Sequence, residues 1–455
     1  MSTKILVPSG VLGLGFDQEA LKLGLERRPD IICIDGGSTD SGPFYLGTGS
    51  TKYSSEICKL EWKTLMKARE QIGVPLVIGT CGTCGTNNMV DWMFDMTHSI
   101  AKEINQKVRV ARIYSEKSTE QLKEALSSGK VFPLEPAPDI DQRKIDTFSH
   151  IVSLAGAEPF QDALNKGVDI ILAGRSTDTA IISALPLMRG ENPGACWHGA
   201  KIAECGAFCS SNPSSGVILL EVDKNGFTVE AMAKDAFCTP RSVSAHMLYE
   251  NSDPYHLSEP GGTLEVKEAS YKSLDKRRVR VTGSKWVPST NYSVKLEGAR
   301  RAGFQTTMLA IIREQRYVKQ AKKWSKKLYE IGIEKIVSVM NIPKEEFTID
   351  IRLIGYDATL GNLEKFKKSP PNELGVLIII TAQSQEIATE ISRLLNPYLL
   401  HLPLSDQEDL PTFAFPYSPV HTERGAVFEF TLNHIQVLDD PMSGFEQKLD
   451  EIDFG

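Results

Sequence analysis

The sequence lacks a long hydrophobic run, and no stretch approaches the roughly 18 consecutive apolar residues that a membrane helix needs. Positive charge is not in excess, because 51 lysines and arginines stand against 58 aspartates and glutamates, for a net charge of −7. This balance gives no support to nucleic-acid binding. The eight cysteines are scattered along 455 residues and form no dense disulfide framework, so we expect reduced thiols.

A secretion signal is also missing from the first residues, which pass directly into an apolar strand pattern at 4–7. We therefore expect a cytoplasmic protein that binds neither nucleic acid nor membranes. The 41% hydrophobic and 24% charged residues are typical of a globular enzyme, and the length suggests roughly two to four domains.

Strand and helix patterns alternate from the N-terminus to about residue 190. Short apolar runs typical of buried strands lie at 4–7, 31–35, 76–78, 108–113, 150–154 and 169–172. Apolar residues at helical spacing lie between some of these runs, as at Leu122, Ala125 and Leu126. The alternation predicts an α/β domain over 1–190 with a Rossmann-like, doubly wound and mostly parallel sheet.

The pattern changes after residue 190, where a mixed α+β region over 191–342 is expected to complete the site. We expect a hairpin, two extended runs and a helix at 217–231, 262–266, 278–281 and 300–333. Strand and helix patterns from residue 347 onward predict a small α+β domain over 343–455. Within it, the lysine-rich run at 365–368 is expected to be a solvated loop.

Two glycine-rich loops directly follow apolar runs and carry reactive side chains. The first runs Gly-Gly-Ser-Thr-Asp over 36–40, and the second runs Gly-Thr-Cys-Gly-Thr-Cys-Gly over 79–85. Loops at the carboxyl ends of strands bind ligands in open α/β sheets, and glycine lets backbone N–H groups approach an anion. We expect the two loops to form the floor of an active site and to bind substrate through Gly36, Gly37, Ser38, Gly82, Thr83 and Gly85.

Three residues are candidates for catalysis. Asp35 ends a buried strand, where it suits a general base or a Mg²⁺ ligand, or else a cap of the next helix. Cys84 belongs to a C-x-x-C pair and suits a nucleophilic thiol, or else buried packing. His198 lies three residues before Lys201 and suits a general acid or base, or else a space-filling core residue.

Metal binding is a further possibility for the cysteines, since Cys196, Cys205 and Cys209 could join the C-x-x-C pair through folding. An early G-x-x-G-x-G pattern at Gly10, Gly13 and Gly15 suits a dinucleotide, a phosphate or CoA group, or a structural turn.

Arg175, Ser176 and Asp178 follow the apolar run at 169–172 and are expected to bind substrate. The planar fork of Arg175 can grip a carboxylate in two hydrogen bonds, with a structural ion pair as the alternative. Ser176 or Thr177 is placed to cap the next helix, and Asp178 suits the positive end of its dipole.

Several of these segments, in this order, resemble the acyclic terpene utilisation family, bacterial proteins grouped with the breakdown of geranyl-type compounds. The most specific parts are Gly-Arg-Ser-Thr-Asp at 174–178 and Glu-Cys-Gly-Ala at 204–207, and the likeness covers about residues 3–355. The tail at 424–432 is similar to a small uncharacterised family often encoded beside the first, here as a fused segment. The resemblance implies a catabolic enzyme acting on small organic acids or their CoA esters.

Together these features predict a lyase of the hydratase or dehydratase type. Its substrate is expected to be a small hydroxy- or unsaturated carboxylic acid or the CoA thioester of one, with Asp35, Arg175 and the 79–85 loop in one pocket. The alternative is a non-catalytic ligand-binding or assembly subunit of a carboxylase-type complex. The sequence identifies no cofactor, although a CoA thioester or a divalent metal would fit, and we expect a homo-oligomer.

Overall fold

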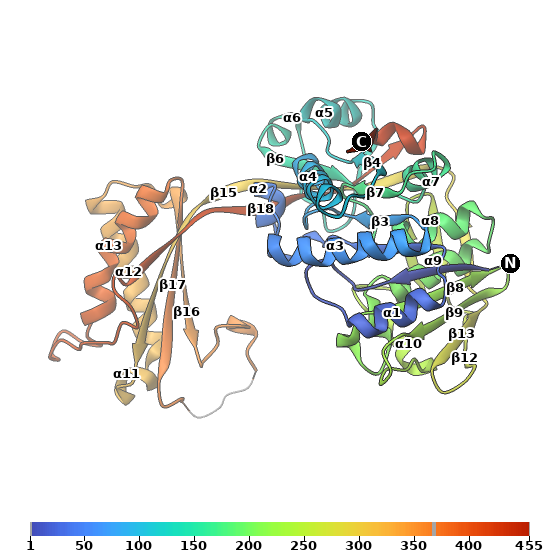
Figure 1. Ribbon diagram of the computed structural model, residues 1–455. Helices are drawn as coiled ribbons and strands as arrows, with labels where there is room; N and C mark the ends of the chain where they lie inside the picture. Colours follow the sequence, from blue (N-terminus) through green and yellow to red (C-terminus); the bar gives the residue numbers. More distant parts are fainter. Residues whose placement is uncertain (1, 366–369, 455) are drawn as a thin grey trace. The chain divides into compact units, whose positions relative to one another are not determined.

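The computed structural model describes residues 2–365 and 370–454, so most of the lysine-rich run at 365–368 lies outside the described residues. The chain forms two compact units, the first comprising Met1–Arg300 with Phe430–Gly455 and the second Arg301–Glu429. Two long strands, β15 (Tyr292–Ile312) and β18 (His421–Leu438), carry the chain from one unit into the other (Figure 1). These bounds differ from the expected division at 190 and 342, because strands that follow residue 190 belong to the sheet of the N-terminal region.

The first unit is built on a ten-stranded mixed sheet in the order β12-β13-β9-β8-β1-β2-β3-β7-β4-β19. Five central strands run parallel, namely β1 (Thr3–Val7), β2 (Ile31–Asp35), β3 (Leu76–Gly79), β7 (Ile170–Ala173) and β4 (Val108–Tyr114). The antiparallel flanks are β8 (Ile218–Asp223), β9 (Gly226–Ala231), β13 (Arg278–Thr282), β12 (Ser270–Ser273) and β19 (Glu446–Ile452). The architecture is therefore mixed α/β, and the expected parallel strands form only the centre of the sheet.

Ten α-helices belong to the described part of the first unit. They are α1 (Gln18–Glu26), α2 (Phe44–Thr48), α3 (Ser55–Ile72), α4 (Asn87–Ile104), α5 (Thr119–Ser127), α6 (Gln142–Ile145), α7 (Glu158–Asn165), α8 (Ala180–Met188), α9 (Pro193–Ala203) and α10 (Pro240–His246). Helices α3 and α4 pack together on the central strands, while α8 and α9 pack on β1, β2, β3, β8 and β9. This packing buries the strands that precede the glycine-rich loops.

Smaller elements complete the first unit. A three-stranded sheet consists of β10 (His256–Glu259), β11 (Gly262–Glu265) and β14 (Lys285–Pro288), and β5 (Val131–Pro133) pairs with β18. Short 3-10 helices lie at Thr39–Ser41, Gly206–Cys209, Pro213–Ser215 and Pro441–Gly444.

Two elements differ from the sequence-based expectation. The apolar run at 150–154 forms strand β6 (Phe148–Ser153), but it pairs antiparallel with β15 and not with the central parallel strands. The segment at 300–312 was expected to be helical and belongs to strand β15 instead. Its buried Met308, Ala310 and Ile312 alternate with less buried neighbours, which is the period of a strand and not of a helix.

In its described residues, the second unit packs three α-helices on an antiparallel sheet. Strand β17 (Leu374–Ala382) pairs with both β15 and β16 (Phe347–Ile354), and the helices are α11 (Gln315–Lys319), α12 (Ala321–Val339) and α13 (Gln385–His401). Two 3-10 helices lie at Lys344–Glu346 and Gly361–Leu363. One face of β17 and the apolar stripes of α12 and α13 form a separate core. Within the described ranges of the whole chain, no helix is long and apolar enough to cross a lipid bilayer.

Trp324 anchors this second core, and we predict that Trp324→Phe lowers the free energy of unfolding by about 1–3 kcal/mol. The buried indole N–H donates a 2.8 Å hydrogen bond to the carbonyl oxygen of Leu402, which phenylalanine would leave without that donor. Denaturant titration followed by circular dichroism measures the effect. Tyr329→Phe on the same helix is the control, because Tyr329 is partly exposed, and an equal loss in both variants would contradict the prediction.

Candidate functional site

The loops that follow β2, β3 and β7 meet at one edge of the central sheet. The N–H of Gly36 donates to the carbonyl oxygen of Gly79 at 2.7 Å, and the N–H of Thr83 donates to that of Gly36 at 2.9 Å. The third loop joins through the N–H of Thr80, which donates to the carbonyl oxygen of Gly174 at 2.9 Å. The two glycine-rich loops and the Arg175 loop therefore form one structure, as expected for neighbouring parallel strands.

Close backbone approach explains several of the glycines. A Cβ on Gly36 would lie 2.5 Å from the carbonyl oxygen of Thr80, and one on Gly85 would lie 2.2 Å from the backbone nitrogen of Arg175. Gly10 fits the same pattern, since its Cβ would lie 3.1 Å from the backbone of Cys205. At Gly36 and Gly85 there is room for hydrogen only, so these two glycines are needed to bring the loops together, whereas a Cβ on Gly10 would require its neighbour to move by a few tenths of an ångström.

The N–H groups of these loops are largely used within the protein. Gly37 donates to Oδ2 of Asp35 at 3.0 Å, Gly85 donates to the carbonyl oxygen of Cys81 at 3.1 Å, and Cys84 donates to that of Gly82. The Ser38 hydroxyl donates to Oδ2 of Asp40 in the exposed part of the first loop. Substrate binding by Gly36, Gly37, Ser38, Gly82, Thr83 and Gly85 stays a prediction.

Arg175 lies buried at this edge, with its guanidinium paired to Glu297 from β15. Nε donates to Oε2 of Glu297 at 3.0 Å, and Nη1 donates to the Thr80 hydroxyl at 3.2 Å and to the carbonyl oxygen of Ser176 at 3.1 Å. Asp178 is a weaker partner at 3.6 Å from Nη1. Burial opposes the charge on Glu297, but Arg175 and Lys295 outweigh it and lower the pKa of Glu297 to about 2.

Asp35 lies beside this pair, and one of its two carboxyl oxygens makes no hydrogen bond to any described residue. Its Oδ1 is buried without a hydrogen-bond partner among the residues described, as is the hydroxyl of Ser176. Both atoms face the same glycine, because a Cβ on Gly79 would lie 2.6 Å from the Ser176 hydroxyl and 3.7 Å from Oδ1 of Asp35. Burial and the negative charge of Asp178 raise the pKa of Asp35 well above its usual range, although Arg175 opposes the shift.

A second group of charged side chains interacts with Asp178 and includes residues near the end of α9. Lys201 contacts Oε1 of Glu204, and both side chains are buried. Burial raises the pKa of Glu204 to about 8 despite Lys201, and burial raises that of Glu259 to about 7. Glu259 accepts a hydrogen bond from the Thr179 hydroxyl through Oε1, while its Oε2 has no such partner within the described chain.

His198 makes a different set of contacts. Its Nδ1 lies 2.7 Å from the Ser284 hydroxyl and its Nε2 lies 3.1 Å from the Tyr271 hydroxyl, in a fully buried position on α9. Burial lowers the pKa of His198 to about 3, which keeps the ring neutral. Both ring nitrogens have protein partners, so Asp35 is the better-placed proton carrier, and a catalytic role for His198 stays a prediction.

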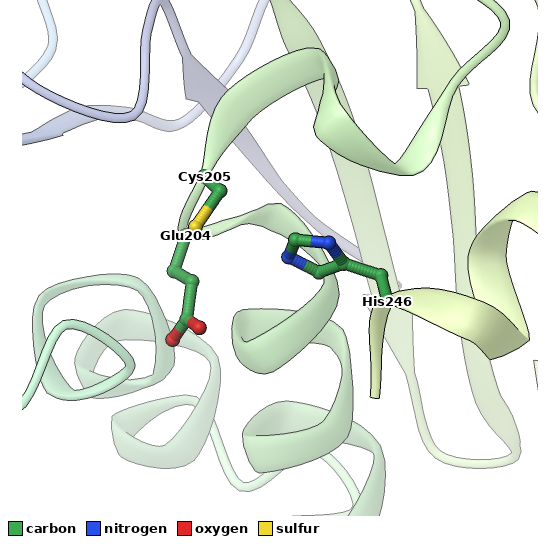
Figure 2. A group of neighbouring side chains, drawn as sticks. All are labelled: Glu204, Cys205 and His246. Carbon is green, nitrogen blue, oxygen red and sulfur yellow. The ribbon is translucent and has the colours of Figure 1, made fainter. Parts of the chain in front are cut away.

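All eight cysteines lie in described ranges and are free thiols. Burial raises the pKa of Cys84, which opposes formation of the thiolate that a nucleophile needs. In the described parts of the chain, one group of three metal-ligating side chains comes together, and it consists of Glu204, Cys205 and His246 (Figure 2). The grouping of Cys205 with Cys196 and Cys209, one of the possibilities that the sequence left open, is not among such groups.

Sequence reasoning missed Glu297, Glu259 and His246 as members of this region. Glu297 lies on a strand about 120 residues after Arg175, and an isolated glutamate in a strand ordinarily indicates a solvent-facing side chain. No local pattern distinguishes it. His246 could have been singled out only together with Glu204 and Cys205, because a histidine, a cysteine and a glutamate are the ligand types of a zinc site.

A comparison with known families decides the relationship of this chain. The model described as acyclic terpene utilisation family protein AtuA matches residues 52–405. The chain belongs to this family. The match includes Cys84, Arg175, Asp178 and His198, while Asp35 precedes it and the tail at 424–432 follows it. The fused character of the tail therefore stays a prediction. No curated protein and no solved structure gives a significant match.

We predict that in this family member Gly85→Ala is more destabilising than Gly73→Ala. Both glycines have φ near +67°, at +66° and +68°, so both variants lose about 1–2 kcal/mol from backbone strain. Gly73 has open space around the position of a Cβ, whereas Gly85 contacts the backbone of Arg175 and should lose roughly 1–3 kcal/mol more. Equal unfolding midpoints in urea would show that the loops do not meet as described.

Glu297→Gln should lower the free energy of unfolding by about 3–5 kcal/mol at pH 7, because Arg175 would be left as a buried, weakly paired cation. The pKa of Glu297 is lowered from 4.5 to about 2 on folding. Its stabilisation is therefore fully present above pH 4.5 and is lost as the pH falls toward 2. Urea titrations across this range should show the two proteins converging at low pH. Glu103→Gln, in an exposed pair with Lys63, should change little.

Proposed function

We propose that this member of the acyclic terpene utilisation family is a lyase that adds water to, or removes it from, a small carboxylic acid or its CoA thioester. The observation that carries the proposal is the unpartnered, buried Oδ1 of Asp35 at a strand end beside Arg175. A carboxyl with a raised pKa is suited to proton transfer near neutral pH. Asp35 and Glu259 both have this property, and Asp178 interacts electrostatically with each.

In the dehydration direction, the Asp35 carboxylate takes the proton from the carbon next to the substrate carbonyl. The electron pair of that C–H bond forms the C=C bond as the C–O bond breaks, and Glu259 gives its proton to the departing hydroxyl, which leaves as water. Hydration runs through the same steps in reverse, with Asp35 as the acid. The raised pKa of both carboxyl groups makes each an adequate acid and, once ionised, a stronger base.

Arg175 supports the choice of an acid as substrate. Glu297 holds one side of the guanidinium, and Asp178 is a longer contact at 3.6 Å. A substrate carboxylate in the place of Asp178 would meet the guanidinium as a charge partner without breaking the pair with Glu297, because both N–H groups of Nη1 already donate to Thr80 and Ser176. The family description directs the first screen to acids with acyclic terpene carbon skeletons, as hydroxy acids, unsaturated acids and CoA thioesters.

Asp35→Asn is predicted to abolish turnover and, at the same time, to stabilise the fold at neutral pH. The folded pKa of Asp35 is raised, so its contribution to stability is present below the unfolded pKa and is lost as the pH rises through the folded pKa. An asparagine carries no charge to bury and avoids that loss. Water addition and loss are followed by product analysis, and stability by thermal unfolding at pH 5 and pH 8.

Asp95→Asn is the matched control, because Asp95 is exposed on α4, and it should retain full activity. Loss of activity together with a lower melting temperature in Asp35→Asn would indicate damage to the fold and count against the assigned role.

If the wild-type chain shows no turnover of any screened acid or thioester, the lyase proposal fails. The assembly-subunit alternative is then tested by size-exclusion chromatography with mass detection, which also tests the expected homo-oligomer.

A further inference from the structure

Three side chains of different chemistry converge where α9 ends. Glu204 and Cys205 directly follow this helix, and His246 is the last residue of α10 (Figure 2). One ligand-type atom from each residue lies within 4.8 Å of the other two. In a tetrahedral zinc site, each ligand lies about 2.0–2.3 Å from the metal, so neighbouring ligand atoms are roughly 3.5 Å apart. Small side-chain movements would bring the three atoms to that spacing.

The histidine has an unused nitrogen in this group. His246 is 6% exposed, and its Nε2 is buried with no hydrogen-bond partner in the part of the chain that the structure describes. Figure 2 shows its ring directed toward Glu204 and Cys205. A buried imidazole nitrogen without a partner is costly, and a metal ion bound there would supply the missing interaction.

The chemistry of the three residues matches zinc better than magnesium or calcium. Zn²⁺ takes thiolate, imidazole and carboxylate ligands, whereas magnesium and calcium take oxygen ligands. One thiolate and one carboxylate carry two negative charges, and Lys201 shares that of the carboxylate. Because three protein ligands leave a fourth position free, the set corresponds to an open zinc site and not to a closed structural one.

Surrounding groups hold two of the ligands in place. Lys201 contacts Oε1 of Glu204, which fixes the carboxylate, and a carboxylate can bind a metal through its other oxygen. The His246 ring stacks on Tyr249, with ring centroids 5.5 Å apart.

We propose that Glu204, Cys205 and His246 bind one zinc-type divalent metal ion, with a fourth coordination position open to water or another small ligand. Binding displaces the proton of the Cys205 thiol, because only the thiolate is a metal ligand. The site stands on its own geometry and does not depend on the proposed lyase reaction.

The test uses the full-length protein after removal of metal with a chelator. Titration with Zn²⁺, measured by equilibrium dialysis and elemental analysis, should show one tight site per chain. Cobalt(II) in its place should give a thiolate-to-metal charge-transfer band in the near ultraviolet. Cys205→Ser should abolish that band, and Cys205→Ser and His246→Ala should each weaken zinc binding at least tenfold.

His256→Ala is the matched control, since His256 is an exposed histidine paired with Asp253, and it should bind metal like the wild type. Thermal unfolding of each metal-free variant checks that the fold is retained. The proposal is overturned if the wild-type protein gives no charge-transfer band with cobalt(II), a result that does not depend on how the variants fold. It is also overturned if Cys205→Ser binds zinc as tightly as His256→Ala.

Discussion

The buried ion pair between Arg175 and Glu297 is the constraint on which the candidate site depends. Both charged groups lie away from water, where a lone charge is strongly disfavoured and the partner must remain in place. The pair joins the loop after β7 to strand β15, and the backbone of Arg175 leaves no space for a side chain at Gly85. The conformation of the second glycine-rich loop, and through it the contact with the first, therefore follows from where Arg175 is held.

The same pair influences the neighbouring carboxyl groups. The positive charge of Arg175 lowers the pKa of Asp35 and of Asp178, but burial outweighs it and the pKa of each stays raised. Asp35 thus keeps a raised pKa although it lies beside an arginine. A substrate-gripping arginine and a structural arginine were alternative interpretations of the sequence. The structure shows the ion pair with Glu297, which is a structural role. The longer contact with Asp178 is the place where Arg175 could also bind a substrate carboxylate while keeping that pair.

The sequence was sufficient for features that depend on local pattern. The apolar runs before Gly36 and Gly79 form buried parallel strands, and the loops after them meet because parallel neighbours share a carboxyl edge. Partners distant in the chain could not be predicted in this way, as Glu297 and His246 illustrate. The segment at 300–312 was included in the helix expected over 300–333, which rested on Ala321, Trp324, Leu328 and Ile331, although its alternating burial arises only when β15 pairs with β17. Long-range pairing decides such segments.

The last strand of the central sheet is separated along the chain from its partner by the whole of the second unit. Strand β19 lies beside β4 at the edge of the central sheet, where Arg112 pairs with Asp450 at 2.9 Å. Residues 446–452 leave the ribosome only after all of Arg301–Glu429 has been made. Until then, β4 has an unpaired edge that can associate with other nascent chains. The inserted unit therefore lengthens the time for which the edge of β4 lacks its partner strand during translation.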